Sequence, residues 1–170
     1  MPNYAEVTLD AMIHSMEEVI VPAVESRHDP VATDHARMLL AQLRFQHERA
    51  AHWRRRARLE LAAYIRMATA VGEHLPLSVA SDLGAAAATG QRLLSDARAD
   101  AEQLEQHTGH LRRALSAVVR TEVQEYPAVA RAIVTHSRAI VEIQRSFYAP
   151  MGWDADVAAV RPFEELSETA

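Results

Sequence analysis

Two long stretches of near-unbroken heptads constrain this chain more than any other feature. Small or apolar side chains recur every three or four positions over residues 33–71 and again over residues 81–123, and neither stretch contains a proline. A helix rises about 1.5 Å per residue, so each stretch predicts a rod of roughly 60 Å. The pattern therefore predicts an all-α protein with two unusually long central helices.

Two shorter amphipathic stretches flank the long ones, at residues 4–24 and 127–147. Helices joined by short turns pack antiparallel, so the sequence predicts an antiparallel four-helix bundle at one end and a protruding two-helix arm over residues 51–100. We expect a single domain over residues 1–150 and a tail over residues 151–170 that packs on the bundle or trails from it. The apolar residues of the tail are Trp153, Val157, Val160 and Phe163.

An isolated two-helix arm would leave an apolar stripe in contact with water. That stripe contains Leu61, Ile65, Leu83 and Leu94. A second copy of the chain that pairs arm with arm across a two-fold axis would cover it, which predicts a homodimer. The alternative is that one long helix breaks, near Gly72 or Gly90, and folds back.

Composition and charge restrict the class of protein. Hydrophobic residues make up 49% of the chain but aromatic residues only 5%, so the core has to be built from aliphatic side chains. All 18 basic residues are arginine, and the formal net charge of −5 gives no basic face for a nucleic acid. The sequence has no cysteine and no apolar run of 18 residues. We therefore expect a cytoplasmic protein that does not cross a membrane.

Three histidines fall near the apolar seams of three different helices and form a candidate metal site. They are His47, His107 and His136. His136 lies between apolar positions of its helix, where a buried polar group needs a partner. It is either a core histidine with a hydrogen bond or a contact to a ligand. His14 and Glu18 share a helix face, and we expect them to form a surface ion pair.

A second candidate site lies at Trp53-Arg54-Arg55-Arg56. Three consecutive arginines cannot share one helix face, because successive residues lie about 100° apart. Arg54 points toward the seam, where it pairs with a carboxylate of the next long helix or, with Trp53 and His136, contributes to a pocket for a small anionic ligand. The carboxylates at matching height are Asp96, Asp100 and Glu102.

Three stretches within residues 8–39, about a quarter of the chain, resemble a known group of proteins. The stretches 8–12, 17–23 and 34–39 are similar to a family of small bacterial helical proteins of unknown function. Members of that family are often encoded beside aminoglycoside-phosphotransferase-like kinases and acyl-CoA dehydrogenases. The resemblance implies an accessory role near acyl-CoA metabolism, and it carries no catalytic residue over to this chain.

Nucleophilic catalysis has no support in the sequence, which contains no cysteine, no glycine-flanked serine and no phosphate-binding loop. The sequence therefore favours a non-enzymatic helical binding or assembly protein, homodimeric and bacterial, with a protein partner or a small anion as its ligand. The alternative is a helical bundle that binds a small ligand or a metal through a polar core layer. No cofactor is indicated by any motif.

Overall fold

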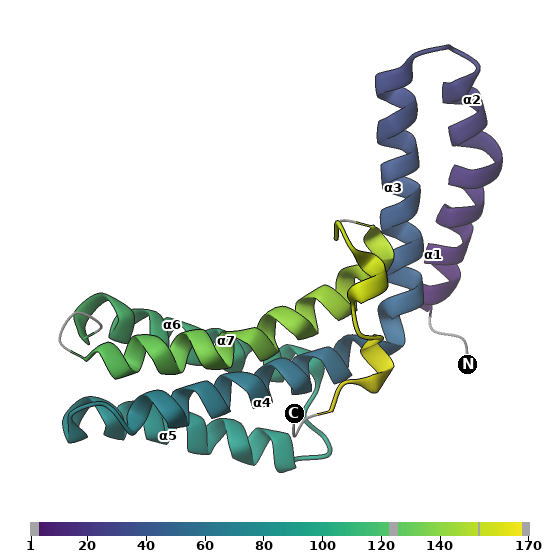
Figure 1. Cartoon of the computed structure of the whole chain (residues 1–170). Coiled ribbons are helices and arrows are strands. Elements are labelled where there is room, and N and C mark those ends of the chain that lie inside the picture. Colours follow the sequence, from purple (N-terminus) through teal and green to yellow (C-terminus); the bar gives the residue numbers. More distant parts are fainter. Residues whose placement is uncertain (1–3, 123–125, 153, 168–170) are drawn as a thin grey trace. The chain divides into compact units, whose positions relative to one another are not determined.

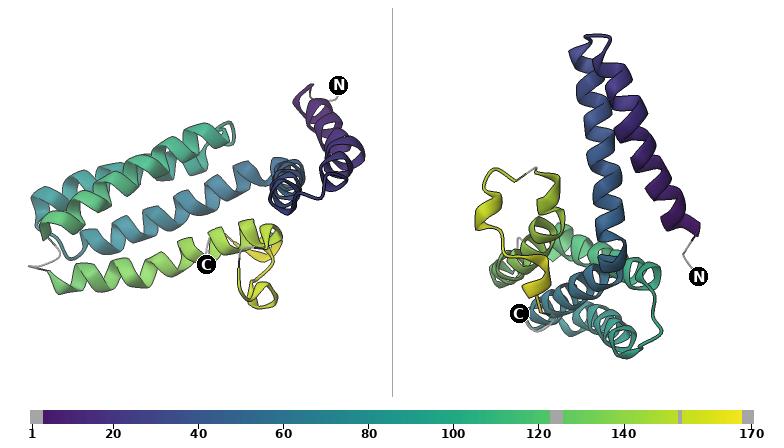
Figure 2. Two further views of the ribbon diagram at one scale, coloured as in Figure 1. Left: turned by 90° about the horizontal axis from the view of Figure 1, so that it is seen from above. Right: turned by 90° about the vertical axis from the view of Figure 1, so that its right-hand side faces the viewer.

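The computed structural model describes residues 4–122, 126–152 and 154–167, so Trp153 and the last three residues of the predicted tail lie outside the described part. Over those ranges the regular structure consists of helices and short helical turns, with no strand. The prediction of an all-α protein is confirmed. Figures 1 and 2 show the helices.

The chain divides into two compact units, where the sequence predicts one domain and a tail. Unit 1 comprises residues 1–52 and unit 2 comprises residues 53–170. The boundary falls inside the first predicted long helix, at a 3₁₀ turn over Ala50–His52. The tail belongs to unit 2 together with the helices before it.

Unit 1 consists of two helical segments joined by a turn (Figure 1). The first runs through α1 (Tyr4–Ser15), a π-helical segment (Met16–Ile20) and α2 (Val21–Glu25). The second is α3 (Pro30–Arg49), whose first turn is capped by the Asp29 side chain. Asp29 Oδ1 accepts hydrogen bonds from the backbone N–H groups of Val31 and Ala32, at 3.0 and 3.1 Å.

The core of unit 1 is small. Met16, Ala36 and Leu40 are buried, and Ile13, Val21, Val24 and Leu43 pack against them while remaining partly exposed. On one side of this core, charged pairs link the two segments. Arg44 Nε donates to Glu17 at 2.8 Å, and Arg37 Nη2 donates to Glu25 at 2.7 Å. The unit therefore joins its two segments through a thin apolar layer and a set of surface ion pairs.

Unit 2 is built from four helices that reverse direction at each connection (Figures 1 and 2). They are α4 (Trp53–Gly72), α5 (Leu77–Ser95), α6 (Ala101–Glu122) and α7 (Pro127–Tyr148). Helix α4 packs against all three of the others. Helix α7 packs mainly on α4 and touches α6 at few points.

The prediction of two uninterrupted long helices is wrong. The first stretch is interrupted by the 3₁₀ turn at Ala50–His52. The second stretch breaks after Ser95, where Asp96 takes an extended backbone conformation. Asp100 then starts α6 through a reciprocal cap. Its Oδ1 accepts from the Gln103 N–H at 2.8 Å, and Gln103 Oε1 accepts from the Asp100 N–H at 3.1 Å. This break lets α6 turn back along α4 and α5.

The fold-back removes the exposed arm on which the predicted dimer depended. Leu61, Ile65 and Leu83 are buried within unit 2, and Leu94 is half-buried. Gly90 does not break its helix. A Cβ at Gly90 would lie 2.9 Å from Cδ1 of Ile65, so the glycine permits close approach of α4 and α5.

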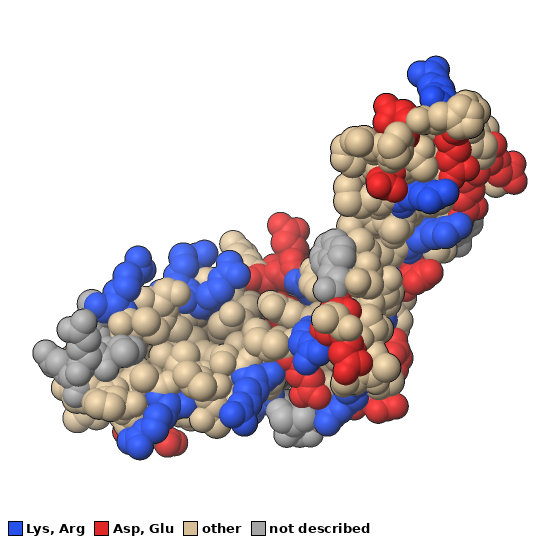
Figure 3. Space-filling model, turned by 45° about the horizontal axis from the view of Figure 1, so that its top comes forward, with Lys and Arg blue, Asp and Glu red and all other residues tan. Residues whose placement is uncertain are grey.

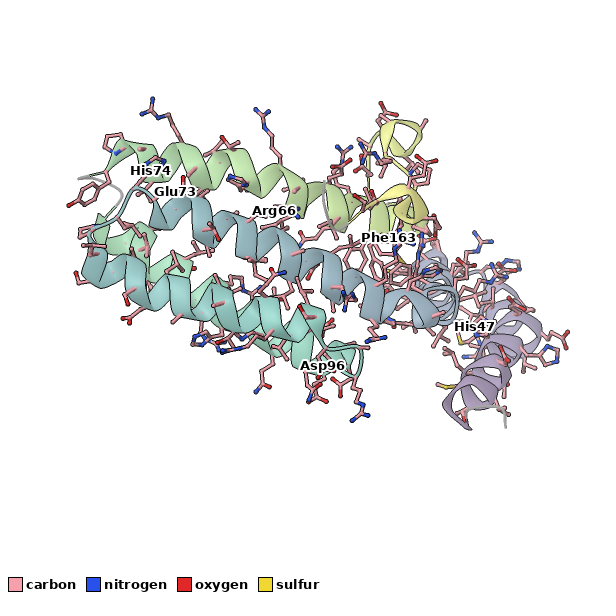
Figure 4. The ribbon with its side chains drawn as sticks, turned by 90° about the horizontal axis from the view of Figure 1, so that it is seen from below. His47, Arg66, Glu73, His74, Asp96 and Phe163 are labelled. Atoms are coloured by element: carbon pink, nitrogen blue, oxygen red, sulfur yellow. The ribbon has the colours of Figure 1, made fainter. Side chains whose placement is uncertain are left out.

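The described part of the tail is anchored on unit 2 through two apolar side chains. Phe163 and Leu166 are buried, and the Phe163 ring meets the Phe147 ring edge to face, with centroids 5.2 Å apart. Figure 4 shows Phe163 against the helices of unit 2. Arg55 Nη2 donates to the carbonyl oxygens of Glu164 and Leu166, at 2.9 and 2.7 Å. The tail segment around Phe163 and Leu166 therefore completes the core of unit 2.

We predict that Phe163→Ala lowers the free energy of unfolding of unit 2 by about 3–4 kcal/mol, because truncation of a buried phenylalanine leaves a cavity. Urea denaturation followed by circular dichroism measures the change. Val157→Ala, at a side chain that is 43% exposed, is the control and should change the stability by less than about 0.5 kcal/mol. A cost below about 1 kcal/mol for Phe163→Ala would contradict the packed tail.

Candidate functional site

The structure gives Trp53 and Arg54 internal partners. Arg54 Nε donates to the Ala99 carbonyl oxygen at 2.8 Å, and Arg54 Nη2 donates to the Ala97 carbonyl oxygen. The guanidinium therefore holds the connection between α5 and α6 through backbone oxygens, whereas one of the two alternatives from the sequence was a pair with a carboxylate. The Trp53 ring packs on the Phe147 ring, with centroids 4.8 Å apart.

Arg56 lies at the centre of an aromatic and acidic cluster. Its guanidinium lies over the Trp53 and Phe147 rings, 4.8 and 5.2 Å from their centroids. It also donates to the Tyr148 hydroxyl and to Glu105, each at 3.0 Å. The arginines at 54–56 thus reach three different parts of unit 2, as their angular spacing on a helix requires.

The three histidines of the predicted metal site lie on three different helices. His47 is on α3 in unit 1, where its Nδ1 lies 3.3 Å from Asp10 Oδ1; Figure 4 labels it. His107 Nε2 on α6 lies 2.8 Å from the Ala86 carbonyl oxygen, and His136 is half-buried on α7. Across the described ranges, no three His, Asp or Glu residues gather closely enough to hold a metal ion. The predicted His14–Glu18 ion pair is present, at 3.1 Å.

A buried acid, Glu60, forms a polar layer that the sequence analysis did not identify. Glu60 on α4 is only 8% exposed, and burial raises its pKa above the ordinary value of 4.5. Arg56, at 3.6 Å, and Arg112 oppose that rise, as does the hydrogen bond with Gln144, while Glu105 adds to it. Burial likewise raises the pKa of Tyr64, one turn further along α4. Arg56 and the Gln144 amide partner the buried carboxylate within the core.

An apolar groove lies on the surface of unit 1. It has a volume of about 470 Å³ and lies between the first helical segment and α3. Its lining consists of Thr8, Ala11, Met12, Ser15, Met16, Ile20, Leu39 and Leu43. None of these residues carries a charge. Met12 is 51% exposed and Leu39 is 57% exposed, so these two large apolar side chains are accessible to solvent.

Charged side chains lie on the other side of unit 1. Successive helical residues are about 100° apart, so Arg37 and Arg44 project from α3 away from Leu39. Both form ion pairs with acids of the first segment. Figure 3 shows acidic and basic side chains on the visible face of unit 1. We call the groove and the eight residues that line it the uncharged face.

The sequence pattern did not separate this face from the core, because Met12 and Ile20 recur at the same helical spacing as the apolar residues that face the next helix. In the structure, Ile13 and Met16 pack inward, whereas Met12 and Ile20 remain 51% and 43% exposed. The available signal was the run Met38-Leu39-Leu40. Consecutive apolar residues cannot all face one neighbour on a helix.

Comparisons with known proteins identify no relative of this chain. None of the family models, the curated proteins or the solved structures matches it. Among the residues that the structure describes, every helix is too short or too polar to cross a membrane.

We predict that the stability of the protein depends on pH through Glu60. A carboxyl group whose pKa is raised by folding contributes stability below pH 4.5, and this contribution is lost as pH rises through the folded-state pKa. Glu60→Gln removes the titrating group. The Tm of the variant minus the Tm of the unchanged protein should therefore increase as pH rises from 4.5 to 8. Differential scanning calorimetry across that range measures it.

Glu73→Gln is the matched control, since Glu73 is exposed at the end of the same helix. Its Tm difference from the unchanged protein should stay nearly constant with pH. A Glu60→Gln difference that is equally constant would show that the buried carboxyl group titrates as it does in water.

Proposed function

We propose that this chain is a non-enzymatic helical assembly protein that forms a homodimer through the uncharged face of unit 1. The observation that carries the proposal is the groove lined by eight uncharged residues, with Met12 and Leu39 half-exposed or more. Contiguous exposed apolar surface on a folded protein marks a site of association. The proposed dimer uses unit 1, and not the arm that the sequence analysis suggested.

The thin core of unit 1 supports an association there. Met16, Ala36 and Leu40 are the buried members of that core, and each side chain adds stability in proportion to the apolar area it removes from water. A second pair of helices laid on the uncharged face would convert a two-helix unit into a four-helix bundle, in which each helix has two apolar neighbours. Burial of Met12, Ile20 and Leu39 would then stabilise both copies.

The distribution of charge favours a second copy of this chain as the occupant. Residues 1–52 hold eight acidic residues and four arginines, a formal net charge of −4, so two copies repel over most of their surface. The groove is the exception, because no charged residue lines it. Two copies that meet groove to groove bury no charge and keep their acidic sides apart.

The dimensions of the face suit a dimer of modest stability. A helix of 20 residues such as α3 is about 30 Å long, and two neighbouring helices are about 20 Å wide. Such a face is of the order of 600 Å² per copy, or about 1,200 Å² in all, at the lower end of stable interfaces. We expect a dimer that dissociates on dilution.

We predict that Leu39→Glu dissociates this dimer. A carboxylate in place of a central leucine puts an unpaired charge into the apolar interface and should cost about 2 kcal/mol or more. This corresponds to a dimer dissociation constant roughly 30-fold higher. Sedimentation equilibrium over a range of protein concentrations measures the constant, and circular dichroism checks that the helix content is unchanged.

Ala41→Glu is the matched control, because Ala41 is exposed on the same helix but lies away from Leu39. It should leave the dimer dissociation constant within about twofold of the unchanged value. An unchanged protein that stays monomeric at every concentration would refute the proposal. So would a Leu39→Glu variant that dimerises as well as the Ala41→Glu variant.

A further inference from the structure

A second groove, in unit 2, has a composition quite different from that of unit 1. It has a volume of about 620 Å³ and lies along α7, beside the tail segment 159–161. From α7 it is lined by Val134, Ser137, Arg138, Val141, Glu142 and Arg145, with Ser146 at its end. Ligand pockets commonly have volumes of about 300–1,000 Å³. The groove is therefore large enough for a small molecule.

Two ion pairs hold the tail beside α7 and so maintain the groove. Arg145 donates to both carboxylate oxygens of Asp154, at 2.6 and 3.0 Å. This fork lowers the pKa of Asp154 below its ordinary value. Arg161 Nε lies 3.4 Å from Glu142 Oε1 further along the tail. Both arginines are thus neutralised by neighbours within the chain.

Arg138 differs from these two arginines. Among the residues that the structure describes, it has no hydrogen bond or ion pair, and it lies between Val134 and Val141 on the groove side of α7. The groove therefore carries one uncompensated positive charge. The Ser146 hydroxyl is a second unsatisfied group, since the side chain is 1% exposed and its Oγ has no hydrogen-bond partner. Buried hydroxyl groups normally have one.

The remaining lining is aliphatic. Val134 and Val141 are 62% and 52% exposed, and Ala159 and Val160 face them from the tail. Apolar side chains at this level of exposure gain stability when a ligand covers them. One free cation beside an aliphatic strip is complementary to a molecule with one negative charge and an alkyl chain.

We propose that this groove binds a monoanionic amphiphile of the alkyl carboxylate class. The carboxylate pairs with the Arg138 guanidinium, and the alkyl chain lies over Val134 and Val141. This site is independent of the association proposed for unit 1.

The test uses the full chain and titrates octanoate by isothermal titration calorimetry. Acetate supplies the charge without the chain, and octanol supplies the chain without the charge. We expect saturable binding of octanoate and much weaker binding of the other two. Equal binding of octanol and octanoate would overturn the proposal by showing that charge plays no part, and so would failure of octanoate to bind.

Matched variants test whether octanoate binds in this groove. Arg138→Gln should weaken octanoate binding by about fivefold, the upper range for an exposed ion pair. Arg131→Gln is the control, because Arg131 is exposed one heptad earlier on α7 and does not line the groove. Val141→Ser should also weaken binding, whereas Leu39→Glu should not, since it alters the face of unit 1. Equal affinities of the Arg138→Gln and Arg131→Gln variants would refute the site.

Discussion

The three consecutive arginines that follow Trp53 hold unit 2 together, because a helix directs successive side chains to different neighbours. Arg54 binds the connection between α5 and α6, Arg55 binds the tail, and Arg56 binds α6 and the end of α7. Two of the three donate to backbone carbonyl oxygens, and a charged donor strengthens such bonds. The first turn of α4 thereby anchors segments far apart in the sequence.

The central position of α4 explains both its burial and the unusual acid within it. Residues 59–63 are all buried, because α5, α6 and α7 each cover a different side of this helix. A helix that is covered on all sides is expected to be apolar throughout. Glu60 departs from that rule and remains in the core because Arg56 and Gln144 partner its carboxyl group. The arginine that binds α6 and α7 therefore also makes the buried acid possible.

Sequence periodicity predicted the all-α class but not where the helices break. One long helix and two successive helices show the same heptad spacing of apolar residues. The break before α6 had a readable signal, because Asp100 and Gln103 have the spacing of a capping box. The break at Ala50–His52 had none. Its residues are not turn formers, so the 3₁₀ turn there reflects packing that local propensity does not encode.

The ligand site was predicted at Trp53 and Arg54 because these residues are aromatic and charged. In the structure, the Trp53 ring packs on Phe147 and Arg54 donates to backbone carbonyl oxygens. A different criterion compares the number of apolar faces on a helix with the number of neighbours that pack against them. Helix α3 needs one stripe for the segment before it, supplied by Ala36 and Leu40, yet it carries a second stripe through Leu39. A helix with more apolar faces than neighbours has surface left over for association, and no charged or aromatic residue is needed to mark it.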